Sequence, residues 1–134
     1  MMKLSRRLVL LLLVHCIVCA SALYSGAADE PERKWTSYMR DRETRVEYFY
    51  DKEALVKPSK ELIQVWRRRV FPTGASQKEI VTLDEIDCRK ARYRSLELSV
   101  TYWDGTTKAY DKVSPWSNVY ANSVEEFLMD EHCK

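Results

Sequence analysis

The clearest hydrophobic and polar pattern in the chain is a strict alternation over residues 96–103. Apolar or aromatic residues take every second position and face mostly polar ones: Leu96, Leu98, Val100 and Tyr102 against Glu97, Ser99, Thr101 and Trp103. A period of two predicts a strand that buries one face and wets the other. Asp104-Gly105 follows, and this pair predicts a type I′ hairpin turn into a second strand over residues 106–110.

Four further strands are predicted upstream, at residues 35–39, 44–50, 62–71 and 80–88, from their β-branched and aromatic alternation. The third of these carries Arg67, Arg68 and Arg69 near its end, so that charges point to both faces. A central strand would have to bury some of that charge. We therefore expect an edge strand, or one that runs past the sheet.

The C-terminal region changes character and predicts a helix. Ser123-Val124-Glu125-Glu126 is a capping box, and about ten helical residues follow it with Val124, Phe127 and Leu128 as the apolar stripe. A helix this short is not stable alone in water, so it must dock on the sheet. The fold class is therefore α+β and mostly β, with an antiparallel sheet of about six strands and one C-terminal helix.

The first residues are typical of a secretory signal peptide. Three basic residues, Lys3, Arg6 and Arg7, precede an apolar run at residues 8–20, which is too short to span a bilayer. Cleavage is expected after Ala22, or as late as Ala27. We expect residues 1–22 to be the signal peptide, 23–34 a flexible leader and 35–134 the domain, and we expect the mature protein to be periplasmic or secreted.

Cysteines give little support for a membrane anchor and much for a disulfide. Cys16 and Cys19 fit a lipidation signal poorly, so membrane contact is expected only through an uncleaved signal or such an anchor. Cleavage leaves Cys88 and Cys133, and an even pair in an exported chain predicts a disulfide. Closing a loop of this size contributes about 4 kcal/mol in the chain-entropy model.

Charge and the remaining chemistry point away from nucleic acid, cofactors and catalysis. The chain has 22 basic and 20 acidic side chains, and losing the three basic residues of the signal leaves 19 against 20, which disfavours general nucleic-acid binding. His132 is the one histidine left after cleavage, and it lacks the partners that an acid–base or metal site needs. Three glycines offer no phosphate loop.

Two stretches interleave cations with aromatic residues. Arg67, Arg68 and Arg69 follow Trp66, and Tyr93 lies within a basic run at residues 89–94. The three arginines are candidate contacts to a polyanion or partner, because cations beside aromatic rings suit both. The alternative is a solvated strand edge.

Taken in order, a series of residues resembles the surface-adhesin protein E-like domain of Gram-negative bacteria: Trp35, Tyr50-Asp51, Val65-Trp66, Glu85-Ile86-Asp87-Cys88, Arg92-Tyr93-Arg94, Asp104-Gly105, Trp116, Ser123 and Cys133. The resemblance implies a curved antiparallel sheet to which Cys88–Cys133 ties the helix. The family's namesake is a surface lipoprotein that binds host extracellular-matrix proteins. We therefore expect an exported non-enzymatic binding module, with adhesin-like protein binding at the envelope and an unknown protein or envelope component as partner. The alternative is a small periplasmic enzyme or inhibitor with a cleft between sheet and helix.

Overall fold

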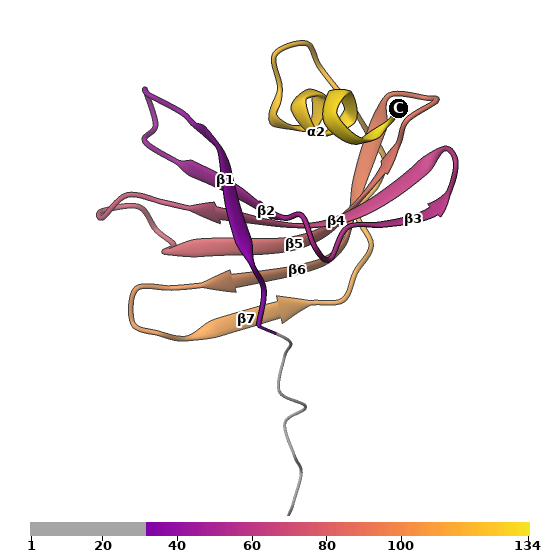
Figure 1. The fold of residues 1–134 in the computed structure, drawn as a ribbon. Coiled ribbons are helices and arrows are strands. Elements are labelled where there is room, and N and C mark those ends of the chain that lie inside the picture. The colour runs from indigo at the N-terminus through magenta and orange to yellow at the C-terminus, as the bar shows by residue number, and fades with distance from the viewer. Residues whose placement is uncertain (1–31) are drawn as a thin grey trace, which may run out of the picture. The chain divides into compact units, whose positions relative to one another are not determined.

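The computed structural model describes residues 32–134, and Arg33–Lys134 form one compact unit. The expected signal peptide, its cleavage sites and most of the leader lie outside the described residues. Those residues form one antiparallel sheet and one helix (Figure 1): β1 Trp35–Arg40, β2 Glu47–Asp51, β3 Val56–Ser59, β4 Leu62–Val70, β5 Glu79–Asp87, β6 Arg92–Thr101, β7 Thr107–Tyr110, β8 Ser117–Asn118 and α2 Val124–His132.

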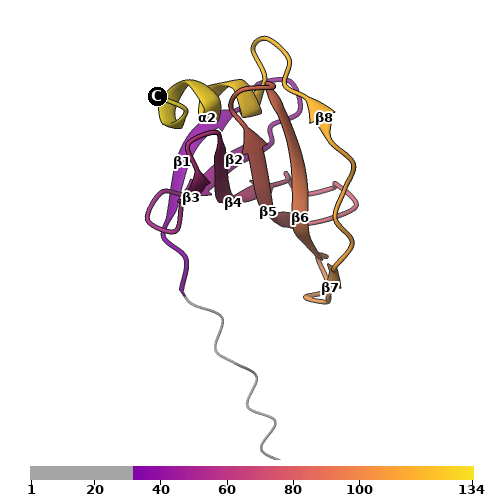
Figure 2. The same cartoon turned by 90° about the vertical axis from the view of Figure 1, so that its right-hand side faces the viewer.

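The strand order across the sheet is β1-β2-β4-β5-β6-β7, with β3 added beside β4 and β8 beside β6. Every pair is antiparallel. Figures 1 and 2 show that the sheet is strongly curved and that α2 lies on one side of it, near the end where β1 and β2 are. The mostly β architecture with one C-terminal helix is confirmed.

Alternation along β4 decides which side chains face the helix. Ile63 and Val65 are buried, whereas Gln64 and Trp66, which alternate with them, are only partly buried. Leu128 of α2 packs on the first pair in a core that also contains Tyr50 and Ile86: Tyr50, Ile63, Val65, Ile86 and Leu128. The docked face of the helix therefore lies over β2, β4 and β5.

The alternation that is clearest in the sequence does not form the core. Leu98 and Val100 of β6 are only partly buried, as are Leu96 and Tyr102. The register between β5 and β6 shifts between Leu83 and Asp84, and a bulge of this kind resets which residues share a face. The helix core contacts lie on β2, β4 and β5, so no helix of the described residues covers the apolar side of β6.

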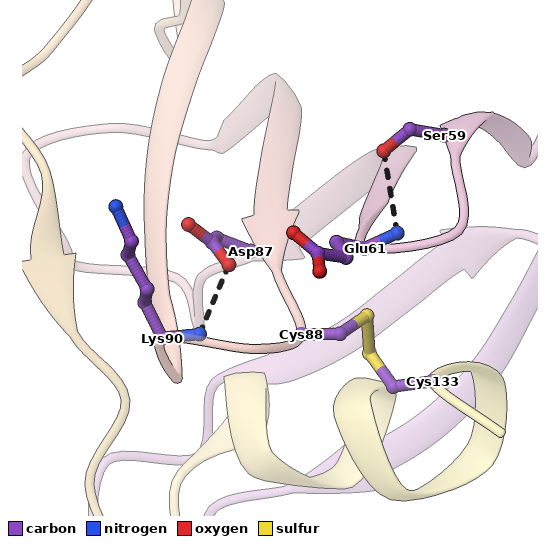
Figure 3. Close-up of a disulfide and its surroundings, with 6 residues drawn as sticks. All are labelled: Ser59, Glu61, Asp87, Cys88, Lys90 and Cys133. Atoms are coloured by element: carbon purple, nitrogen blue, oxygen red, sulfur yellow. Dashed lines mark hydrogen bonds between the residues drawn. A yellow bond between two sulfur atoms is a disulfide. The ribbon is translucent and has the colours of Figure 1, made fainter.

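The helix begins and ends as its sequence predicts. The Ser123 hydroxyl accepts a hydrogen bond from the Glu126 amide at 3.1 Å, and the Glu126 carboxylate accepts one from the Asn122 amide at 2.6 Å. At the other end Cys133 forms the predicted disulfide with Cys88, with 5.6 Å between the Cα atoms (Figure 3). Cys88 directly follows β5, so the bond joins the helix end to the end of a central strand.

The stretch containing Pro58 forms β3, a short and fully exposed strand where proline is tolerated at an edge. Two expectations about strands and turns are wrong. β4 is neither an edge strand nor one that runs past the sheet, because β2 pairs with one side of it and β5 with the other. Of the Asp104-Gly105 pair only Gly105 has a positive φ, +86°, so the hairpin closes by a three-residue loop rather than a type I′ turn.

Candidate binding surface

The three consecutive arginines of β4 occupy three different environments. Strand alternation places Arg67 and Arg69 on the helix side of the sheet and Arg68 on the opposite side. Arg67 is buried, whereas Arg68 and Arg69 are partly buried. The structure therefore does not gather the predicted arginine triplet into one patch.

Arg67 joins the helix to the sheet through two carboxylates. Its Nε lies 2.6 Å from Oδ2 of Asp84 on β5, and its Nη1 donates to Oε1 of Glu125 on α2 at 2.7 Å. The side chains of Arg67 and Asp84 are 7% and 0% exposed, so neither charge is solvated. The Ser95 hydroxyl also donates to Asp84, at 2.7 Å. We call Arg67, Asp84 and Glu125 the arginine clamp.

The clamp favours the charged forms of Arg67 and Glu125. Burial alone would raise the pKa of Glu125, but the Arg67 guanidinium outweighs burial and holds that pKa below its ordinary value. Burial alone would lower the pKa of Arg67, and the carboxylate of Asp84 reverses that direction. Desolvation also raises the pKa of the neighbouring Tyr38 phenol. These directions are those of an ion-pair network that joins α2 to the sheet.

A groove of about 450 Å³ lies where the sequence analysis placed a cleft, between the start of α2 and strands β1, β2 and β4. Its lining mixes both charges with two apolar residues: Met39, Asp41, Tyr48, Arg67, Arg69, Asn122, Ser123, Val124 and Glu125. Both of its carboxylates are already engaged, because Glu125 pairs with Arg67 and Asp41 accepts the amides of Glu43 and Thr44. No cluster of three metal-ligating side chains occurs within residues 32–134.

His132 is the last residue of α2. Its ring is tilted against Tyr50 with 5.6 Å between centroids, and its Nε2 is buried without a hydrogen-bond partner. Burial lowers its pKa, which the carboxylate of Glu131 partly opposes. These contacts are those of a packed side chain.

The opposite side of the sheet carries a second and larger group of side chains. Cross-strand pairs place Phe49 beside Arg68, Trp66 beside Leu83, and Glu85 beside Arg94 on this side. We call it the tryptophan–arginine face, and its members are Trp35, Phe49, Trp66, Arg68, Glu85, Arg92, Arg94 and Trp116. Because α2 packs on the other side (Figure 2), no helix of the described residues covers this face.

Arginine guanidinium groups and aromatic rings alternate over the face. Arg92 and Arg94 lie 4.4 and 4.5 Å from the centre of the Trp116 ring. Arg68 lies 5.9 Å from the rings of both Trp35 and Phe49. All of these distances are within the range of a cation–π contact.

Arg33, just before β1, adds a further contact at 3.5 Å from the centre of the Trp66 ring. Lys34 beside it pairs with Glu53 at 2.8 Å. The last residues of the expected leader therefore lie against the sheet.

Carboxylates on the same face hold the guanidinium groups in place. Glu85 accepts two hydrogen bonds from Arg94, at 2.7 and 2.9 Å, while the Gln64 amide donates to its other oxygen. Arg68 donates twice to Glu79, at 2.6 and 2.8 Å. Charge-assisted pairs of this kind fix the direction of an arginine and leave its outer N–H groups available.

Asp87 completes the pairs on this face. It accepts the Arg92 Nε–H at 3.1 Å. It also accepts the Lys90 amide at 2.9 Å, as Figure 3 shows. Burial opposes ionisation of Asp87, yet these bonds hold its pKa below the ordinary value. Every arginine that the face presents from β4 and β6 is thus paired with a carboxylate.

Comparison with known families decides the class of the protein. The model of the surface-adhesin protein E family matches residues 35–134. The chain belongs to the surface-adhesin protein E family. No curated protein and no solved structure matches the chain.

Membership of the surface-adhesin protein E family suggests an exported or surface protein that binds another component and is not an enzyme. Within residues 32–134, no helix is long and apolar enough to cross a membrane. The family assignment confirms the sequence-based recognition.

The sequence identifies Cys88 and Cys133 correctly, but it does not identify the tryptophan–arginine face. The basic run at residues 89–94 indicates cations beside an aromatic residue and says nothing of the partners of Arg92 and Arg94. Trp116 reaches them because Ser117–Asn118 pairs back on the start of β6. The interleaving of cations and aromatic residues is the signal that the sequence offers.

Proposed function

We propose that this protein is an exported, non-enzymatic binding module that contacts a partner protein through the tryptophan–arginine face. The observation that carries the proposal is an open side of the sheet on which three tryptophans lie among pre-oriented arginines. Tryptophan and arginine are the side chains that most often dominate the free energy of protein–protein contacts. An adhesin-like role at the bacterial envelope is consistent with this composition and with the family.

The balance of charge on the face favours a protein partner over a general polyanion. Arg68, Arg92 and Arg94 are matched by Glu79, Asp87 and Glu85. A polyanion such as DNA would meet those carboxylates as well as the guanidinium groups, and its binding depends on an excess of positive charge. A folded protein with both charges and apolar side chains can complement both.

The proposed location is the periplasm or the medium after removal of residues 1–22, or of residues up to Ala27. The basic start and short apolar run of the sequence support this location. The face is then available to proteins outside the cytoplasm.

The test substitutes one exposed residue on each side of the sheet. Glu97 is exposed and pairs with Leu83, which places it on the tryptophan–arginine face; Asp130 is exposed on α2. Glu97→Arg and Asp130→Arg make the same change of charge. The readout is binding of the purified protein to a basement-membrane extract coated on a plate, compared across both variants.

We expect Glu97→Arg to weaken binding about tenfold or more, the effect of losing roughly 1.4 kcal/mol at a contact centre. Asp130→Arg should bind like the unaltered protein. Equal binding by all three proteins, or a loss confined to Asp130→Arg, would mean that the tryptophan–arginine face does not bind the partner.

A further inference from the structure

The β7 strand is an open edge of the sheet. Among the described residues it pairs with β6 alone, in a register without a bulge from Leu98–Tyr110 to Thr101–Thr107. All four of its residues are exposed. The edge at β1 is different, because its pairing with β2 is interrupted by a register shift between Ser37 and Met39. Bulges, lysines and very short strands all blunt an edge against further pairing. β7 has no bulge, but it has four residues and carries Lys108, so a partner strand there has to supply an acidic group.

The direction of the β7 backbone groups follows from their neighbours. The Thr101 carbonyl accepts from the Lys78 amide at 2.9 Å, so Thr101 turns its backbone groups toward β5. Thr107 opposite it is therefore a non-hydrogen-bonded partner, and the 3.0 Å contact between the two threonine hydroxyls agrees with the close side chains of such a pair. Two residues further, Ala109 has the same orientation. The N–H and C=O groups of Thr107 and Ala109 therefore point away from the sheet.

The two sides of this edge differ in chemistry. Lys108 and Tyr110 share a side with their partners Val100 and Leu98, and this is the apolar side of β6 that the helix leaves uncovered. Tyr110 is 46% exposed. The other side is lined by small or hydroxyl side chains: Ser99, Thr101, Thr107 and Ala109.

We propose that the β7 edge binds an extended segment of a partner protein as an additional strand. The segment places a carboxylate beside Lys108 and an aliphatic side chain beside Tyr110, with small polar residues between them. Main-chain bonds to Thr107 and Ala109 supply affinity, and the alternating side chains supply selectivity. β7 has the sequence Thr-Lys-Ala-Tyr and contains no carboxylate, so the partner segment supplies the acidic group that a second β7 would lack. This site is separate from the tryptophan–arginine face.

The probe is the peptide Thr-Glu-Thr-Val-Thr-Val-Thr-amide with fluorescein attached to its N-terminal amine, and the readout is fluorescence anisotropy with the purified protein. Ala109→Pro removes an outward N–H without removing a bond to β6, which is where an edge strand tolerates proline. Ala109→Ser keeps that N–H and is the matched control. We expect about a tenfold or greater loss of peptide affinity for Ala109→Pro and less than about a twofold change for Ala109→Ser.

A charge reversal tests the site without altering the backbone. Lys108→Glu should lose the glutamate peptide and bind the same peptide with lysine in place of glutamate. Melting temperatures of all variants control for folding.

Failure of the unaltered protein to bind the peptide, or equal binding by Ala109→Pro and Ala109→Ser, overturns the proposal. So does self-association that Ala109→Pro abolishes while no peptide binds, because the occupant is then a second copy. Binding to the matrix extract by an Ala109→Pro variant leaves the tryptophan–arginine face intact, which separates the two proposals.

Discussion

At the scale of single residues, Arg67 shows how far burial changes what a charge does. An arginine with 7% of its side chain exposed is stable only because Asp84 and Glu125 approach it from β5 and α2. Such a network adds little net stability compared with apolar packing, but removing one partner leaves uncompensated buried charge. Arg69, two residues along the same strand, lines an open groove, so its charge can be solvated.

Replacing Arg67 and Arg69 singly by alanine should separate these roles. Arg67→Ala is expected to lower the free energy of unfolding by about 3–5 kcal/mol, because it leaves the buried Asp84 carboxylate without a cation. Arg69→Ala should change it by less than about 0.5 kcal/mol. Urea unfolding measures both. Equal small losses would mean that the clamp is not structural.

The polyanion contact inferred from the three arginines remains a proposal, and within the triplet it falls most naturally on Arg69. Arg67 faces two carboxylates and Arg68 is paired with Glu79. Heparin retention of the Arg69→Ala variant, compared with that of the unaltered protein, tests it. Unchanged retention would mean that Arg69 does not contact the polyanion.

At the scale of elements, α2 is fastened at both ends. Arg67 holds its first turn through Glu125, and the Cys88–Cys133 bond holds Cys133, the residue that directly follows the helix. Between these ties only Leu128 is fully buried. A helix of nine residues has little stability of its own, so the ties decide whether it stays docked.

Replacing Cys133 with Ser should therefore release the helix from its C-terminal end. Amides of residues 128–132 should lose protection from hydrogen exchange first, while β4 and β5 remain protected. The loss of stability should be up to about 4 kcal/mol for a loop of 45 residues. Cys88→Ser should give the same pattern. Simultaneous loss of protection in β4 and α2 would show that the helix is not a separate unit.

The same elements show what the sequence could predict. Apolar alternation located β4 and β5, and the capping box located the start of α2, because these signals are local. β3 was not predicted because it is short, fully exposed and without apolar alternation, and Pro58 indicates only that the stretch is not helical. The placement of β4 failed because the carboxylates that allow Arg67 to be buried come from β5 and α2, far along the chain. No local sequence pattern predicts ion-pair partners that lie so far apart in the chain.

At the scale of the whole fold, the sheet has two different sides. One side carries the helix, the arginine clamp and the apolar core; the other carries Trp35, Trp66 and Trp116 among paired arginines. The sequence predicted a binding module but placed its contacts on Arg67, Arg68 and Arg69. The tryptophan–arginine face is assembled by the β5–β6 register shift and by the return of β8, both of which depend on long-range pairing.

Site-specific photo-cross-linking shows whether a partner protein contacts the tryptophan–arginine face. Benzoylphenylalanine is placed at position 97 on the face or at position 130 on the helix, and each protein is irradiated on the basement-membrane extract. We predict a protein adduct from position 97 and none from position 130. An adduct from position 130 alone would mean that the partner contacts the helix side of the sheet and not the tryptophan–arginine face.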